Sequence, residues 1–175
     1  LRPGLSRGRV TPRSRLLPAL SGQAPCRIVL HPHKHKRGYP MTLEEVRRHF
    51  DAHDTFARHL GIDIVEIGQD RAVVSMPFDE RHRNGMGHAH GGAIFALADL
   101  AFAAASNASG ISCVNAQTSI SYIAPGQVGP LRGEARALHI GRKLVTYEVT
   151  VFDAADTLVA KAQITGYVKG VPLAV

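Results

Sequence analysis

The residues best suited to chemistry lie in one stretch, residues 84–107, which reads NGMGHAHGGAIFALADLAFAAASN. Its second half is a run of small apolar residues, typical of a helix that is buried on every face. Asp99 interrupts this run, and no basic residue lies within one helical turn of it. Because a buried carboxylate without a partner is costly, such a residue indicates a perturbed pKa and a chemical role.

The start of the same helix offers a second functional group. His90-Gly91-Gly92 stand where the helix begins, and glycines allow the backbone to approach a ligand closely. The first N–H groups of a helix have no intrahelical partner and lie at the positive end of its dipole. The sequence therefore predicts backbone donors that can polarise a carbonyl group or hold an oxyanion.

The spacing of these two groups has a geometric consequence. Gly91 and Asp99 are eight residues apart, which corresponds to roughly 12 Å of helix rise. A reacting carbonyl should lie about 3 Å from its oxyanion donors and close to its base. We therefore expect Gly91 of one subunit to act together with Asp99 of another, at an interface between two chains.

Asn84, His90-Gly91-Gly92 and Leu97-Ala98-Asp99 keep a spacing that resembles the hotdog-fold acyl-CoA thioesterases of the phenylacetate-pathway (PaaI) type. Asn107 after the helix also fits, and the likeness covers roughly residues 41–169. The resemblance implies an α+β hotdog fold, in which an antiparallel sheet wraps around a long central helix. It also implies a homo-oligomer, with a dimer as the minimum and a dimer of dimers, a homotetramer, as the usual state.

The resemblance also implies roles for single residues. Asp99 is the catalytic carboxylate, acting as general base or as nucleophile, and the Gly91 N–H polarises the carbonyl. Asn84 holds the water or the carbonyl in place, and His90 orders the loop. Position 103 is Ala, whereas some family members carry a hydroxyl residue there, so a mechanism that needs this hydroxyl is not supported.

The implied reaction is hydrolysis of acyl-CoA thioesters to the free acid and coenzyme A. Gly92 lines the predicted site, and Phe95, with Ile94 and Phe102, is a candidate wall for aryl-acetyl or medium-chain acyl groups. Two alternatives remain open. One is an acyl-thioester-binding hotdog protein without turnover. The other is a hydroxyacyl-thioester dehydratase, which would require a catalytic His paired with an acid.

Two other residue sets could bind ligands. Arg142 and Lys143 stand in a predicted turn and could contact the phosphates of coenzyme A, although a solvated turn is equally consistent with their types. His88 and His90 with Asp99 might suggest a metal site. No Cys accompanies them and the resembling family needs no metal, so we expect neither a metal nor a cofactor.

The remaining pattern positions these groups. Thr42 with Glu45 fits a capping box at the start of a helix over residues 41–60, and Gly61 would end it. Alternating apolar residues predict six strands, at residues 62–67, 72–78, 112–123, 131–140, 144–152 and 157–168. Strands divided by one central helix are typical of an α+β fold with an antiparallel sheet.

The positive charge of the chain is concentrated in residues 1–40. This segment holds nine Lys and Arg residues and no acid, whereas the other 135 residues hold 12 basic and all 14 acidic ones, a net charge of −2. We expect 1–40 to be a basic, disordered leader outside the fold and 41–175 to be the thioesterase domain. The leader is most simply an over-extended reading frame or an added segment. A native basic tail, an Arg-rich transit peptide and a nucleic-acid-binding segment are the alternatives.

Composition bounds the partners and the compartment. The domain itself is slightly acidic, so we expect no nucleic-acid partner. We also expect no membrane partner, because the sequence shows no apolar segment that would indicate one. Cys26 and Cys113 are too few to form a disulfide framework. A cytoplasmic location is therefore expected.

Overall fold

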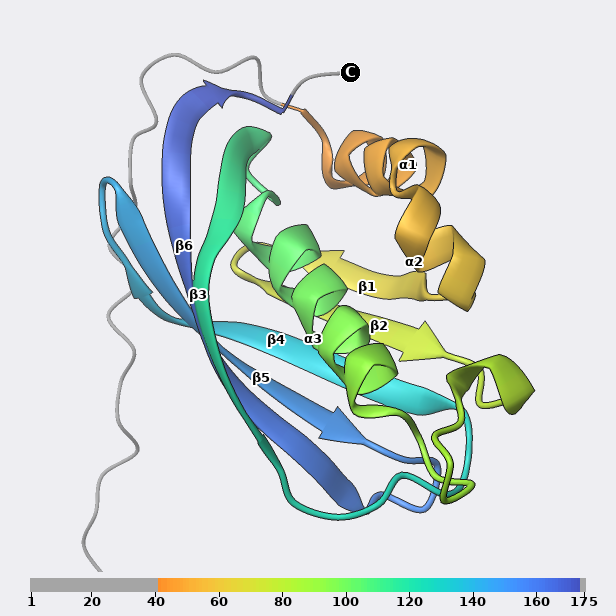
Figure 1. Cartoon of the computed structure of the whole chain (residues 1–175). Coiled ribbons are helices and arrows are strands. Elements are labelled where there is room, and N and C mark those ends of the chain that lie inside the picture. Colours follow the sequence, from red (N-terminus) through yellow and green to blue (C-terminus); the bar gives the residue numbers. More distant parts are fainter. Residues whose placement is uncertain (1–40, 174–175) are drawn as a thin grey trace, which may run out of the picture.

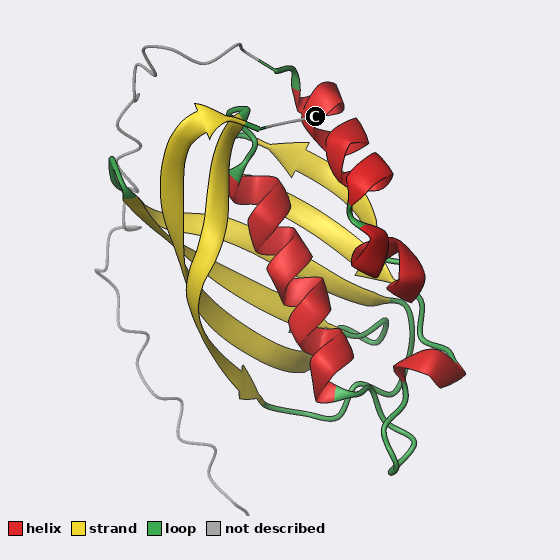
Figure 2. Ribbon diagram, turned by 45° about the horizontal axis from the view of Figure 1, so that its top comes forward, coloured by secondary structure: helices red, strands yellow, loops and turns green. Residues whose placement is uncertain are grey.

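The computed structural model describes residues 41–173 and shows an α+β fold, in which one antiparallel sheet curves around a long helix (Figure 1, Figure 2). The predicted hotdog architecture is confirmed. The predicted leader, residues 1–40, lies outside the described residues.

The sheet has six strands in the order β1-β2-β4-β5-β6-β3, and β1 and β3 form its edges. The strands are β1 (Asp63–Gly68), β2 (Arg71–Met76), β3 (Ile111–Tyr122), β4 (Leu131–Ile140), β5 (Leu144–Phe152) and β6 (Leu158–Pro172). All six predicted strands are confirmed, and β6 extends further than predicted. The long connection from β2 to β3 carries the central helix, so the chain crosses the sheet and β3 lies at the edge away from β1.

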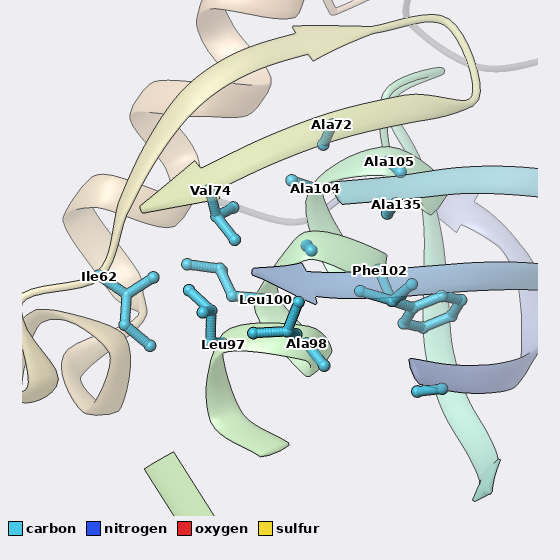
Figure 3. Close-up of a cluster of buried hydrophobic side chains, with 14 of the residues drawn as sticks. Ile62, Ala72, Val74, Leu97, Ala98, Leu100, Phe102, Ala104, Ala105 and Ala135 are labelled. Carbon is cyan, nitrogen blue, oxygen red and sulfur yellow. The ribbon is translucent and has the colours of Figure 1, made fainter. Parts of the chain in front are cut away.

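The central helix is α3 (Gly91–Ser106), and it lies on the concave face of the sheet (Figure 1). Leu97 and Leu100 point toward Ile62 and Val74 in the core (Figure 3). The alanines of α3 allow this close packing, because their small side chains let the helix axis approach the strands. Although α3 is strongly apolar, none of the helices between residues 41 and 173 is long and apolar enough to cross a membrane.

One side of α3 stays open in the single chain. Phe95 is 38% exposed, and other residues on this side are exposed or half-buried: Gly92, Ala96, Asp99, Ala103 and Ser106. Their spacing of three or four residues places them on one stripe of the helix. The expectation that α3 is buried on every face is therefore wrong for the isolated chain.

The predicted first helix is two helices, α1 (Leu43–His53) and α2 (Thr55–Leu60), which lie beside α3 (Figure 1). The chain breaks at Asp54, whose carboxylate accepts the Ala57 N–H at 2.9 Å and caps α2. The capping box of Thr42 is confirmed, and so is the end at Gly61, which adopts a left-handed conformation with φ of 67°.

Candidate active site

The start of α3 presents one free backbone donor. His90 caps the helix, and its Nδ1 accepts the N–H of Gly92 at 2.9 Å. Tyr122, at the end of β3, donates its hydroxyl to the Gly91 carbonyl at 3.1 Å. Among residues 41–173, none accepts a hydrogen bond from the Gly91 N–H. The Gly92 donor is therefore occupied by the cap, and the Gly91 N–H is available for a ligand.

Asp99 is half-buried and has a polar partner. Its Oδ1 accepts a hydrogen bond of 2.7 Å from the side-chain amide of Asn115, which also donates to Thr118 Oγ1 at 2.8 Å. Its other oxygen, Oδ2, has no partner in the described part of the chain. The expectation of a buried carboxylate without a partner is thus wrong, because β3 supplies an amide and the open side of α3 admits solvent.

A β-bulge in β3 brings Asn115 to this position. The pairing of β3 with β6 shifts between Asn115 and Gln117, which leaves Ala116 as an extra residue. Asn115 and Thr118 are three residues apart and would face opposite sides of a regular strand. The extra residue resets the alternation, so both face α3. Asn115 was not predicted from the sequence, because a strand rich in β-branched residues contains no local signal of a bulge.

Asn84 organises the loop that precedes α3. Its Oδ1 accepts the backbone N–H groups of Met86 at 2.9 Å and His88 at 3.1 Å. The loop is also joined to the segment after β3, because the Ala89 N–H donates to the Gly126 carbonyl at 2.9 Å. The side-chain amide nitrogen of Asn84 has no partner within residues 41–173, so it remains free to meet a water or a carbonyl.

Two arginines near this loop are engaged within the protein. Arg81 binds the carboxylate of Asp79 and donates to the His59 carbonyl at 3.0 Å. Its hydrogen bonds hold the pKa of Asp79 below the ordinary value. Arg83 forms an ion pair with Glu80 at 3.0 Å. These contacts fix the loop in place and leave the two guanidinium groups less available for a ligand.

Arg142 and Lys143 lie far from Gly91 within one chain. Their turn begins β5, which pairs through β6 with the start of β3 near Val114. Gly91 contacts Tyr122, at the other end of β3. The strand between Val114 and Tyr122 spans about 25 Å. A role for the basic turn in binding phosphates therefore stays a prediction that concerns an assembly of chains.

The three predicted wall residues have different surroundings. Phe102 is 1% exposed and points into the core (Figure 3). Its ring packs edge-on against the ring of Tyr147, with 5.5 Å between the two ring centroids. Ile94 is also buried, whereas Phe95 lies on the open side of α3. Of these three side chains, Phe95 alone is placed to contact a ligand on that side.

The chain thus carries two half-sites, an amide donor at Gly91 and a carboxylate at Asp99, at separate positions along α3. The first can hold a developing negative charge on oxygen, and the second can accept a proton or attack a carbonyl carbon. Between Met41 and Leu173, no three His, Cys, Asp or Glu side chains are grouped so that they could hold a metal ion.

Comparison with known proteins identifies the family. The model of the thioesterase superfamily matches residues 86–160. The acyl-coenzyme A thioesterase PaaI of Escherichia coli (strain K12) is 35% identical over 108 residues, which cover 61% of this chain and 77% of that protein. A putative esterase of Archaeoglobus fulgidus is 36% identical over 126 residues, covering 71% of this chain and 82% of that protein.

Solved structures agree with the sequence comparison. The structure of the E. coli PaaI protein from the phenylacetic acid degradation operon superposes with a TM-score of 0.69 at 30% identity, covering 72% of this chain and 92% of that one. A Streptococcus mutans protein solved bound to acetyl CoA superposes with a TM-score of 0.60 at 33% identity, covering 63% of this chain and 90% of that one. The chain therefore belongs to the thioesterase superfamily, as a PaaI-like enzyme with the hotdog fold.

Proposed function

We propose that this thioesterase hydrolyses acyl-CoA, with aryl-acetyl or medium-chain acyl groups as its preferred substrates. The observation that carries the proposal is that α3 holds both a Gly91 N–H and an Asp99 Oδ2 that have no hydrogen-bond partner among residues 41–173. The relatives support the choice of thioester, since one is named an acyl-coenzyme A thioesterase and one was solved with acetyl CoA.

The complete site requires two chains. β3 is an edge strand of 12 residues, bound to β6 on one side only, and such an edge is a ready surface for pairing. Pairing of two β3 strands about a two-fold axis would place two α3 helices antiparallel, with their open sides facing. Gly91 of one chain would then approach Asp99 of the other. Association of two such dimers into a tetramer is part of the proposal.

In this arrangement the reaction needs three groups. The Gly91 N–H binds the thioester carbonyl oxygen and stabilises the negative charge that develops on it. Asp99 of the second chain uses Oδ2 either to take a proton from the attacking water or to attack the carbonyl carbon itself. Asn115 holds Oδ1, so that the carboxylate cannot turn away. When water attacks, the thiolate of coenzyme A leaves and the acid forms directly. When Asp99 attacks, the thiolate leaves a mixed anhydride on Asp99, and water then cleaves this anhydride to release the acid and restore the carboxylate.

The proposal also includes a cytoplasmic location. Acyl-CoA esters are intracellular metabolites, and Cys113 is a free, buried thiol, as expected where thiols stay reduced.

A thiol-release assay tests the function. The full chain is assayed with phenylacetyl-CoA, benzoyl-CoA, and short, medium and long fatty acyl-CoA, beside Asp99→Asn and the control Asp70→Asn. Asp70 lies in the β1–β2 turn and has a positive φ of 59°, a conformation that Asn also tolerates. We expect wild type and Asp70→Asn to release thiol, and Asp99→Asn to lose about 10²- to 10⁴-fold in kcat. A folded wild type that cleaves none of these thioesters would refute the proposed function.

A further inference from the structure

A buried histidine outside the two half-sites connects the core to the start of α3. His82 ends the short 3-10 helix η1 (Glu80–His82) and is 0% exposed. A buried imidazole must have its nitrogen atoms satisfied. The side chain of His82 takes no direct part in the proposed hydrolysis.

Both ring nitrogens of His82 are engaged. Nε2 lies 2.7 Å from the carbonyl oxygen of Leu60, and because a carbonyl can only accept, Nε2 carries the hydrogen. Nδ1 accepts the Asp79 N–H at 3.2 Å and lies 3.1 Å from Asp79 Oδ1. The ring therefore joins two segments that are distant in sequence, the end of α2 and the start of the loop.

The main chain of His82 makes the second connection. Its carbonyl accepts the N–H of His90 at 2.7 Å, and a bridge between Arg83 and Ala89 lies next to this bond. His90 immediately precedes Gly91 and caps α3. The place where His82 is held therefore bears, through His90, on the position of the Gly91 N–H, beside the hydrogen bond from Ala89 to Gly126.

The anchor itself is rigid. Leu60 and Ala57 bury α2 against the core, so the Leu60 carbonyl is a fixed point. This carbonyl is one of the groups that a helix leaves unpaired at its end. A second tether, from Arg81 to the His59 carbonyl, supports the same loop but is half exposed. The loop would therefore keep a support without His82, while its connection to His90 would loosen.

We propose that His82 is a positioning residue for thioester hydrolysis, which orients the Gly91 N–H by tying the loop to the end of α2. The inference rests on the proposed function of Gly91. A donor displaced by about 1 Å can cost on the order of 100-fold in rate, so an indirect tether of this kind is enough to affect kcat.

Three substitutions in the full chain separate the contacts of the ring. In His82→Gln the amide nitrogen can reach the place of Nε2 and keep the Leu60 bond. In His82→Asn the side-chain oxygen can replace Nδ1 but not Nε2, and His82→Phe removes both. The control is Tyr147→Phe, which deletes a hydroxyl from another buried ring, 1% exposed, near Asp70.

The kinetic readout is the division between kcat and KM. We expect His82→Phe and His82→Asn to lose about 10- to 100-fold in kcat with KM for acyl-CoA nearly unchanged. His82→Gln should retain most of kcat, and Tyr147→Phe should resemble wild type. Wild-type kcat in both His82→Phe and His82→Asn would overturn the proposal. If His82→Phe does not fold, equal activity of the Gln and Asn variants overturns it as well.

Amide hydrogen exchange is a readout that does not depend on activity. In His82→Phe the His90 N–H should exchange about tenfold faster or more, while the Ala101 N–H in the middle of α3 keeps its wild-type rate. Equal acceleration at both amides would mean general destabilisation and would overturn the proposal. If the wild type cleaves none of the thioesters, the proposed function is refuted. If the His90 N–H still exchanges faster in His82→Phe, the structural connection between His82 and His90 is supported all the same.

Discussion

The side-chain amide of Asn115 on β3 donates a 2.7 Å hydrogen bond to Oδ1 of Asp99 on α3. This contact fixes the carboxylate from a different element and leaves its second oxygen without a partner among residues 41–173. Because an amide can donate without carrying charge, it orients Asp99 and does not neutralise it.

Replacing Asn115 by Asp tests this contact. Asn115→Asp keeps the shape but sets two carboxyl groups 2.7 Å apart, and like charges at such a distance raise a carboxyl pKa. The acidic limb of the pH–rate profile should therefore move to higher pH, with a lower kcat at neutral pH. Gln117→Glu is the control, because its new charge lies on the opposite face of β3. An unchanged profile for Asn115→Asp would contradict a role of this contact in catalysis.

Gly91→Pro tests the amide donor. Proline is favoured at the first position of a helix and removes only the N–H, and His90 has the extended conformation, with ψ of 134°, that a following proline requires. We expect a folded protein with kcat lower by about 10²- to 10³-fold, as for loss of one oxyanion donor. Gly91→Ala keeps the N–H, and its Cβ would meet Tyr122 at an ordinary 3.4 Å. A proline variant as active as the alanine variant would exclude the donor role.

Mixing two inactive variants tests the division of the site between chains. Gly91→Pro and Asp99→Asn proteins are unfolded together, refolded in equal amounts and assayed. If each site uses Gly91 from one chain and Asp99 from the other, half of the dimers are mixed and each has one intact site. About a quarter of the wild-type activity should then return. No recovery, with mixed dimers demonstrated by mass spectrometry, would place both groups of a site in the same chain.

Glu148 gives a pH-dependent contribution to stability. Its carboxylate lies 2.8 Å from Lys161 and 2.7 Å from Arg136, and hydrogen bonds from Lys161 first, then Arg136, hold the pKa of Glu148 below its ordinary value. The folded state thus favours the ionised form, so the stabilisation is complete above the unfolded pKa of about 4.3. It is lost as the pH falls through the lower, folded pKa.

Urea unfolding of Glu148→Gln across pH 3 to 7 measures this contribution. We expect a cost of about 1 kcal/mol or less at pH 7, because the partners are largely exposed, and a smaller difference from wild type at acid pH. Glu66→Gln, which breaks the more exposed pair with Arg71, should cost less at pH 7. A difference for Glu148→Gln that grows on acidification would contradict the assigned direction.

The groups that could be predicted from the sequence are those that differ from their surroundings. Asp99 is a carboxylate in an apolar helix, and Gly91 and Gly92 stand where a helix must begin, so local chemistry alone points to them. The six strands were predictable for a similar reason, since the alternation of apolar residues repeats over most of each strand.

The residues that escaped prediction depend on contacts between distant segments. His82 is buried because its ring meets Leu60, 22 residues earlier, and no local pattern records that contact. Asn115 reaches Asp99 only because of a bulge. The break at Asp54 was hidden because an apolar stripe continues from α1 into α2, although an Asp is well suited to cap a new helix. The open side of α3 could not be recognised either, since its alanines look the same whether a sheet or a second chain covers them.

The bulge at Ala116 has a further consequence for how one strand can serve both half-sites. Asn115 and Tyr122 are seven residues apart, an odd separation, so in a regular strand one would face α3 and the other would face away. One additional residue changes the parity of the strand, and both side chains then reach α3, one at Asp99 and the other at Gly91. Deletion of Ala116 would therefore leave the strand in place while forcing it to give up its contact with either the Asp99 carboxylate or the Gly91 carbonyl.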